Sequence, residues 1–461
     1  MTKKRLIFVV LLQCCFAMVG IAQSPKPVDP KDGIFLDVGS AGVRRIKIAF
    51  PIVAGGAPAA PKDKKPVLDS AIAEEFKRLF DFTMSFDVIP EASFPSSAEA
   101  FAVPLPTDRW KSLGVELVVL GTVEKDANNT RSLEFRLYDA QKGTRLMGKK
   151  FSKIPESETS VVIKRFSDLV MKELTGQMGV FSTKMAFAAA AKPGKSKEIY
   201  IADFDGRNVV QITNDGVPHM SPSWSPDGSK LTYTSFKSGR AQIWVYNLLT
   251  RKSLPLTRTS GNTSGAEWHP DAKSIAFSMS GEGKTAIYTM KSFDGTEVKP
   301  LVQGSGLEVE PAYSPDGKFI AFASGRFGNP HLFVRDLSTG GDTRITFAGW
   351  YNSSPSWRPD GKKIIFAGYD REIDRYDLFT VNPDGRQLER ITLDQGDNEN
   401  PTFSPDGRFV LFQSNRRDGA RGKQAGYRLF VMTKDGAGQR PLVMPFSDVT
   451  MPSWSPYLVG L

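Results

Sequence analysis

A short turn motif that occurs six times constrains the fold of this chain more than any other sequence feature. The first copy is Pro222-Ser-Trp-Ser-Pro-Asp-Gly228, and versions of it follow at Ala266, Pro311, Pro355, Pro401 and Pro452. The second prolines of the copies, at 226, 270, 315, 359, 405 and 456, are 44, 45, 44, 46 and 51 residues apart. Repeats of roughly 40–50 residues, each with one fixed turn, are typical of the blades of a β-propeller.

Each copy of the motif reverses the chain between two strands. Proline pre-sets φ, aspartate binds backbone amides of the turn, and glycine adopts a positive φ, so we interpret the aspartates as turn residues. Short apolar runs predict a second strand at 185–187, 231–233, 275–277, 320–322, 364–366 and 410–412. A third is predicted at 199–201, 243–245, 287–289, 332–334, 378–380 and 429–431, and a fourth at 211–213, 255–257, 344–346 and 390–392. Four short strands per repeat predict one blade.

Two incomplete repeats indicate how the ring closes. Residues 184–213 supply three strands without a first one, whereas residues 448–456 supply only a first strand. Sharing one blade between both segments would leave no exposed strand edge. The sequence therefore predicts an all-β propeller of six blades at 179–461.

The N-terminus predicts export. Lys3-Lys-Arg5, an apolar run from Leu6 to Ile21 and small residues up to Ala22 resemble a cleaved secretory signal over residues 1–22. Both cysteines, Cys14 and Cys15, lie inside this signal, so we expect no disulfide in the mature chain. Lipoprotein processing at Cys14 is a weak alternative, because Leu12-Gln13 does not supply the small residues of a lipobox.

A smaller α/β domain is predicted between the signal and the propeller. Residues 23–32 are rich in proline and lysine and predict an extended, mobile arm. Residues 33–178 then alternate strand and helix patterns, which makes two domains in all. Helices are predicted at 67–82, 107–113 and 158–174, and strands at 34–36, 46–50, 115–123, 132–138 and 145–151. The strongly apolar segment at 115–123 is expected to be central in its sheet.

Charge and motifs argue against several classes of function. The net charge of +10 could suit nucleic acid, but export and a lack of interleaved aromatic residues in the basic stretch at 416–423 argue against it. His219, His269 and His331 lie in different repeats without metal-ligand spacing to one another, so no metal site is expected. No hydrolase elbow or phosphate loop is present. We therefore expect neither a cofactor nor an enzyme.

The loops that lead into the six innermost strands should surround one mouth of the propeller. Loops on a rigid scaffold commonly carry binding residues. Ordinary solvated loop residues remain an equally open interpretation for any single position. The candidate partner-binding residues at this mouth are His219, Asn262, Glu308, Glu310, Asn352, Asp397, Glu399, Asn400 and Asp448.

Taken together, these motifs resemble the TolB family of periplasmic propeller proteins. The resemblance covers nearly the whole mature chain and rests on the signal, the six turns and three further segments. These are Trp110-Lys-Ser-Leu-Gly-Val-Glu-Leu-Val-Val-Leu-Gly121, Leu174-Thr-Gly176 and Pro452-Ser-Trp-Ser-Pro-Tyr-Leu458. It implies a monomeric, non-enzymatic adaptor of the Tol-Pal system in a Gram-negative periplasm, supporting outer-membrane integrity and constriction at cell division.

The resemblance also implies two partners. The propeller mouth would bind a Pal-type peptidoglycan-associated lipoprotein, with Glu310 at the position of a family glutamate, whereas Asn262 stands where a family member has histidine. The start of the mature chain would bind TolA through Ile34, Phe35, Leu36 and Asp37, and the extra arm at 23–32 is a departure there.

Two other classes of exported propeller are alternatives to an adaptor. A peptidase-type propeller would need a hydrolase domain, which the sequence lacks. A ligand-sensing or glycan-sensing propeller would need an aromatic or metal-bearing mouth, whereas these loops are mainly polar and acidic; it remains the alternative.

Overall fold

The computed structural model describes residues 44–55, 66–126, 130–281, 283–393, 395–417 and 423–458. All the described residues belong to one compact unit. The predicted signal at 1–22, the arm at 23–32 and the candidate residues Ile34, Phe35, Leu36 and Asp37 lie outside the described residues. Within the described ranges, no helix has the length and apolar character needed to cross a bilayer.

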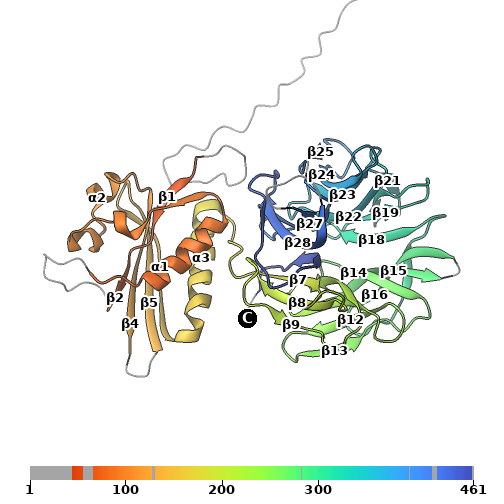
Figure 1. The fold of residues 1–461 in the computed structure, drawn as a ribbon, viewed down its shortest axis with the longest axis horizontal. Coiled ribbons are helices and arrows are strands. Elements are labelled where there is room, and N and C mark those ends of the chain that lie inside the picture. The colour runs from red at the N-terminus through yellow and green to blue at the C-terminus, as the bar shows by residue number, and fades with distance from the viewer. Residues whose placement is uncertain are drawn as a thin grey trace, which may run out of the picture. The chain divides into compact units, whose positions relative to one another are not determined.

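The N-terminal α/β region is built on a six-stranded sheet with the order β3-β1-β4-β5-β6, with β2 also paired to β4 (Figure 1). Strand β4 is central, as its apolar sequence predicted, because it pairs in parallel with β1 and antiparallel with β5. The short strands β2 and β3 were not predicted. The strands are β1 Ile46–Ala49, β2 Ile52–Ala54, β3 Phe86–Val88, β4 Leu117–Lys125, β5 Thr130–Asp139 and β6 Thr144–Pro155.

Helices α1 (Ser70–Phe82) and α3 (Thr159–Thr175) pack side by side against this sheet. The Asp69 carboxylate caps α1 by accepting a hydrogen bond of 3.1 Å from the Ile72 amide. Phe76 of α1 stacks on Phe50 at 5.1 Å and meets Phe166 of α3 edge-on at 6.1 Å. The remaining helices are α2 Thr107–Lys111 and the 3₁₀ turns η2 Glu91–Ser93, η3 Ala98–Phe101 and η4 Glu156–Glu158.

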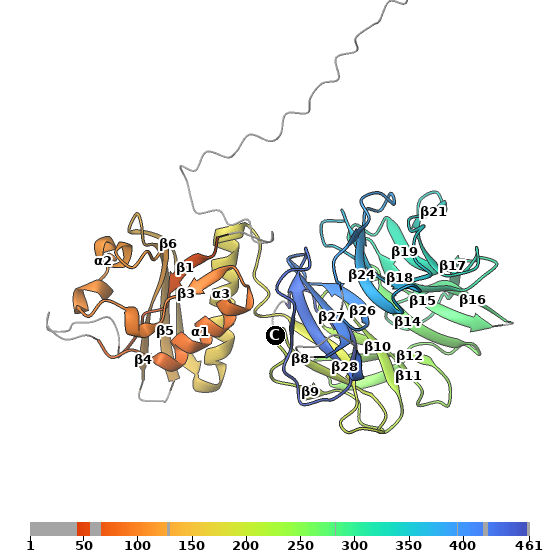
Figure 2. The ribbon, with the colours of Figure 1, turned by 45° about the horizontal axis from the view of Figure 1, so that its top comes forward.

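The second part of the chain is a six-bladed propeller of four-stranded antiparallel sheets, as predicted (Figure 2). The strands of the first three complete blades are β10 His219–Trp224, β11 Lys230–Ser235, β12 Gln242–Asn247, β13 Lys252–Pro255; β14 Asn262–Trp268, β15 Ser274–Gly281, β16 Lys284–Lys291, β17 Lys299–Val302; and β18 Glu308–Tyr313, β19 Phe319–Ser324, β20 His331–Asp336, β21 Asp342–Arg344. Those of the next two are β22 Tyr351–Trp357, β23 Ile364–Asp370, β24 Arg375–Val381, β25 Glu389–Arg390; and β26 Asn398–Phe403, β27 Phe409–Arg416, β28 Lys423–Thr433, β29 Arg440–Pro441.

The chain ends form the last blade together, which confirms the predicted closure. Strand β30 (Val449–Trp454) pairs with β7 (Lys184–Ala189), followed by β8 (Glu198–Asp203) and β9 (Val210–Gln211). The Lys184 amide donates to the Ser455 hydroxyl at 2.9 Å, across 271 residues of sequence. Every blade therefore has two neighbours.

The predicted fourth strands were placed too far along the chain. In four blades the strand ends before the predicted Ile-Thr or Leu-Thr pair, for instance at Gln211 rather than Thr213. The reason is that each threonine hydroxyl replaces a backbone carbonyl as the acceptor for the third strand. The Ile199 amide donates to Thr213 Oγ1 at 2.9 Å, and Ile243, Leu332 and Leu378 donate likewise to Thr257, Thr346 and Thr392 at 3.0, 2.9 and 2.8 Å.

The aromatic residue of the turn motif connects neighbouring blades. The indole Nε1 of Trp357 donates to the Ala312 carbonyl of the preceding blade at 2.9 Å, and Trp224 and Trp268 make corresponding bonds to Ser453 and Thr232. Trp454 donates to Thr183 Oγ1 at 2.9 Å. Each of these aromatic residues ends an innermost strand. The indoles of Trp357, Trp224 and Trp268 also pack in the apolar clusters between neighbouring blades, and that of Trp454 stacks on Phe409 at 6.4 Å.

We expect Trp454→Ala to lower the free energy of unfolding by about 3–5 kcal/mol, because it empties a large buried site and removes a bond that closes the ring. Trp350→Ala is the control, since that indole is 43% exposed and Trp454 only 6%. The control should cost less than about 1 kcal/mol. Equal losses for both variants in chemical denaturation would contradict the assigned role of Trp454.

Candidate functional site: the axial channel

The innermost strands of all six blades line one axial cavity of about 540 Å³. Its wall is formed by β10, β14, β18, β22, β26 and β30, each contributing the residues just before and within its turn motif. The first two side chains of each motif thus meet around a common axis, although they are far apart in sequence.

A β-bulge in every innermost strand turns one residue into this cavity. In β10, for example, residues 221 and 222 lie between the pairs Met220–Thr234 and Ser223–Thr232, so that two residues oppose one. The first residue of each bulge has a positive φ between 49° and 62°. We call these six residues the channel ring: Ser221, Gly265, Glu310, Ser354, Asn400 and Met451.

Five of the six ring residues are not glycine, so most blades accept a left-handed conformation that costs on the order of 1 kcal/mol or more. The same five are followed by proline. Proline suits the second position of the bulge because it has no N–H that would need a ladder partner. The repeated proline two positions before the aromatic residue is therefore the sequence signal for the channel ring, because it directly follows each ring residue except Gly265.

Glu310 is the acidic member of the channel ring. Its Oε2 accepts a hydrogen bond of 2.6 Å from the Ser354 amide, and the Ser354 hydroxyl donates to Asn400 Oδ1 at 3.0 Å. This chain of polar contacts crosses three neighbouring blades. Burial raises the pKa of Glu310 above its ordinary value, against the opposing effect of the Ser354 N–H.

A second carboxyl group, that of Glu267, also lines the channel. The Ser223 hydroxyl of the adjacent blade donates to its Oε2 at 3.0 Å. Burial raises the pKa of Glu267 to about 7, and the single hydrogen bond from Ser223 opposes this only in part. The channel therefore holds two carboxyl groups whose charged forms are poorly solvated.

The candidate residues from the sequence fall into three groups. Glu310 and Asn400 lie together in the channel ring. His219, Glu308 and Asn352 are 1%, 0% and 2% exposed and do not line the channel. Glu308 is hydrogen-bonded within its own blade, whereas His219 and Asn352 are hydrogen-bonded to the preceding blade. The third group also lies off the channel wall and consists of Asn262, Asp397, Glu399 and Asp448. Asn262, Asp397 and Asp448 accept hydrogen bonds from the backbone amides of Ala241, Tyr376 and Tyr427, respectively. Glu399 accepts one from the Tyr427 hydroxyl.

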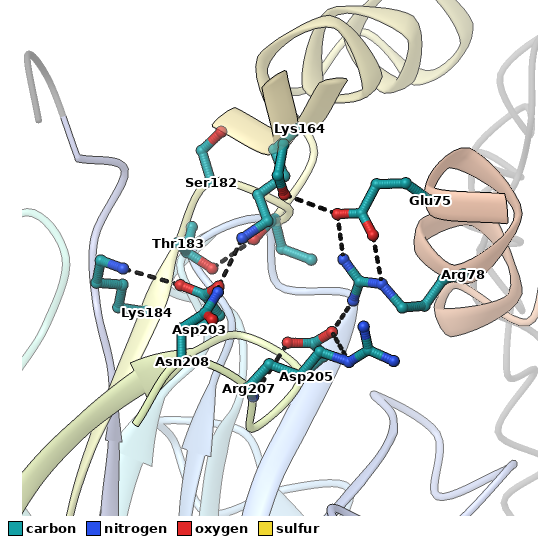
Figure 3. A network of polar contacts seen from close by, with 12 residues as sticks. Glu75, Arg78, Lys164, Ser182, Thr183, Lys184, Asp203, Asp205, Arg207 and Asn208 are labelled. Atoms are coloured by element: carbon teal, nitrogen blue, oxygen red, sulfur yellow. Dashed lines mark hydrogen bonds and ion pairs between the residues drawn. The ribbon is translucent and has the colours of Figure 1, made fainter. Parts of the chain in front are cut away.

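A polar network joins the α/β region to the propeller (Figure 3). Arg78 of α1 pairs with Glu75 on its own helix at 2.7 Å and with Asp205 after β8. Lys164 of α3 lies 2.6 Å from Asp203, which also binds Lys184 at 2.8 Å. Although burial acts to raise the pKa of Asp203, these two ammonium groups hold it below its usual range.

A buried carboxylate of α3, that of Asp168, binds the segment that connects α3 to β7. Asp168 accepts hydrogen bonds from the amides of Phe181 and Ser182 at 2.8 and 3.0 Å. Burial raises the pKa of Asp168 to about 6, more than these bonds lower it. Beside it, Phe82 of α1 packs edge-on against Phe204 at 4.7 Å, so polar and apolar contacts both hold the two parts together.

Comparisons with known proteins agree with this architecture. Family models of the TolB beta propeller domain and the TolB amino-terminal domain match residues 171–458 and 36–146. The chain is 31% identical over 334 residues to the Tol-Pal system protein TolB of Bordetella pertussis, covering 63% of this chain and 75% of that protein. It is 30% identical over 440 residues to a TolB homolog of Chlorobium luteolum, covering 95% and 96%.

A solved structure agrees as well. The crystal structure of TolB from Acinetobacter baumannii superposes with a TM-score of 0.74 at 27% identity, covering 90% of this chain and 97% of that one.

We expect Glu267→Gln to remove part of the pH dependence of stability. Because the folded-state pKa is raised, the contribution of Glu267 is fully present below pH 4.5 and is lost as the pH rises through about 7. At pH 8 the variant should be more stable than the parent by on the order of 2 kcal/mol, with little difference at pH 4. Denaturation across this range tests it, with Glu389→Gln as a control, whose carboxylate is 62% exposed. An unchanged pH slope in Glu267→Gln would contradict the assignment.

Proposed function

This chain belongs to the TolB family, and on that basis we propose that it is a non-enzymatic periplasmic adaptor of the Tol-Pal envelope system. One surface is the channel ring and its mouth, which binds a Pal-type lipoprotein. The other is the N-terminal segment, which binds TolA. Through these two contacts the protein supports outer-membrane integrity and constriction at division.

The main support for the first contact is that the Glu310 carboxylate is buried without a counter-charge among the described residues. Its only hydrogen-bond donor among the described residues is the Ser354 amide, and no cation of the described chain pairs with it. A buried carboxylate without a counter-charge is costly. A donor or cationic side chain from a partner, inserted along the channel, would complete its coordination and so gain specificity as well as affinity.

Exposed apolar side chains at the mouth, where loops lead into the innermost strands, support a protein partner. The loops leading into innermost strands and the loops between second and third strands share this end of each blade. On three successive blades they expose Leu307, Phe327, Phe347, Trp350, Ile373 and Leu393, by 36% to 71%. The Arg371 guanidinium lies 3.6 Å from the centre of the Trp350 ring. Aromatic and arginine side chains in such a patch are typical of protein interfaces.

The second contact rests on the family alone, since residues 34–37 lie outside the described part of the chain. Ile34-Phe-Leu36 is a short apolar run of the kind that could add a strand to a partner's sheet. The arm at 23–32 precedes it and lacks that pattern, so we assign TolA binding to the residues after 32.

We expect Glu310→Ala to weaken binding of a Pal-type lipoprotein domain by more than about 1 kcal/mol, or roughly fivefold, because it removes the acceptor in the channel. Calorimetry on the mature protein measures this. Glu389→Ala, on outer strand β25, is the control and should leave the affinity unchanged. Full affinity in Glu310→Ala would remove Glu310 from the site. A bound glycan or small molecule, in place of any lipoprotein, would favour the ligand-sensing alternative.

Deleting residues 23–32 should leave TolA affinity unchanged, whereas deleting 23–38 should abolish it, because the apolar strand-forming residues lie only in the longer deletion. Both deletions lie outside the described residues, and lipoprotein binding by each variant reports whether the propeller is unaffected. Loss of TolA binding in the shorter deletion would assign that role to the arm instead.

A further inference from the structure

A compact group of metal-ligating side chains lies in the blade that closes the ring, apart from the channel ring. His219 Nε2 is 2.7 Å from Asp215 Oδ1 and 3.4 Å from Glu198 Oε2, and one ligand atom from each residue lies within 4.8 Å of the others. Glu198 begins β8, His219 begins β10, and Asp215 lies in the loop between β9 and β10. Spacing between histidines does not predict this group, because it combines one histidine with two carboxylates from separate segments.

The buried part of the group is oriented by its surroundings. Glu198 Oε1 accepts from the Gly216 amide at 2.8 Å and Oε2 from the Thr213 hydroxyl at 2.5 Å. The His219 ring is 1% exposed, and its Nδ1 has no hydrogen-bond partner among the described residues. All the polar contacts of this imidazole are therefore made through Nε2 with the two carboxylates.

The same position in other blades shows what is unusual here. In three blades, the residue before the third-strand core, the bridging threonine and the first or second residue of the next innermost strand contact one another. In two blades that last residue is asparagine: Asn352 contacts His331 at 2.9 Å, and Asn398 donates to Asp377 at 3.0 Å. These sets form ordinary hydrogen bonds between consecutive blades.

The Glu198 group differs from those sets in the charged residues that pair with its carboxylates. Asp377 is paired with Arg375 at 3.2 Å and also with Arg390, and buried Glu308 is paired with Arg326 at 3.1 Å. Glu198 has no lysine or arginine partner among the described residues, and Lys237 pairs only with the outer oxygen of Asp215, at 3.2 Å. The cationic partner of Glu198 is therefore an imidazole shared with a second carboxylate, whereas Asp377 and Glu308 are paired with guanidinium groups.

We propose that Glu198, Asp215 and His219 form a binding site for a divalent transition-metal ion of the Zn²⁺ or Mn²⁺ class. Three ligands with one imidazole and two carboxylates suit these ions better than Ca²⁺ or Mg²⁺, which prefer oxygen alone. The hydrogen bonds from Thr213 and Gly216 supply the outer support that such ligands need. Asp215, with 27% of its side chain exposed, is the entry side. The ion would tie the β9–β10 loop to β8 at the rim of the propeller.

The test uses untagged, full-length mature protein, freed of metal by a chelator and titrated with ZnCl₂ and with MnCl₂ by calorimetry. Co²⁺ serves as a spectroscopic probe, because its absorption between 500 and 700 nm, roughly, reports coordination by nitrogen and oxygen. We expect one ion per chain with Kd below about 100 µM. His219→Asn should fold, since other blades carry asparagine at this position, and should lose at least about tenfold in affinity.

Two kinds of variant make the outcome decisive. Asp215→Asn changes the most exposed ligand and should also lose at least about tenfold, so it decides the matter if His219→Asn does not fold. His269→Asn is the matched control. Its Nδ1 lies 2.7 Å from Asp271, but no second carboxylate among the described residues joins this pair, so metal affinity should be unchanged. Absence of binding by the parent protein, or full affinity in Asp215→Asn, would overturn the proposal.

Discussion

The pairing of β30 with β7 is the contact on which the rest of the structure depends. It joins the two ends of the propeller sequence and gives every blade a neighbour on both sides. Only a closed ring brings Ser221 and Met451, the first and last members of the channel ring, to within 3.5 Å through Oγ and Sδ. Closing so long a loop costs little more entropy than closing a short one, because that cost grows only with the logarithm of length. The indole bond of Trp454 and the apolar packing around it are available to offset that cost.

A second constraint acts on the inner wall. A regular innermost strand would alternate its side chains between the two faces of the blade, whereas the bulge turns one residue per blade toward the axis. The positive φ at these positions is energetically unfavourable for five of the six side chains, yet all six blades keep it. Strain retained at one equivalent position in every repeat suggests a function for that position. This geometry directs the serine, glutamate, asparagine and methionine side chains of the ring into the channel.

The sequence predicted the parts of the fold that depend on local turn chemistry and period. The turn motif and its spacing gave six blades, and the unequal ends of the repeat region predicted the shared blade. The failures have physical causes. The threonine hydroxyls at 213, 257, 346 and 392 end the fourth strands early, which strand propensity does not register. His219, Glu308 and Asn352 were assigned to the mouth because they lie in the segments that lead into the innermost strands, but their side chains are buried and hydrogen-bonded within or between blades. Glu310 was singled out by family resemblance, whereas Glu267 and Ser354 become visible only when the six strands are assembled.

If the channel formed by the six innermost strands is the site of partner binding, a lipoprotein partner should protect its wall. Hydrogen exchange of the mature protein, measured alone and with a Pal-type lipoprotein domain, provides the test. We expect new protection in peptides that contain residues 307–311, 350–354 and 397–401, at the mouth ends of three adjacent innermost strands. Protection confined to outer strands or to the α/β region, with these peptides unchanged, would contradict it.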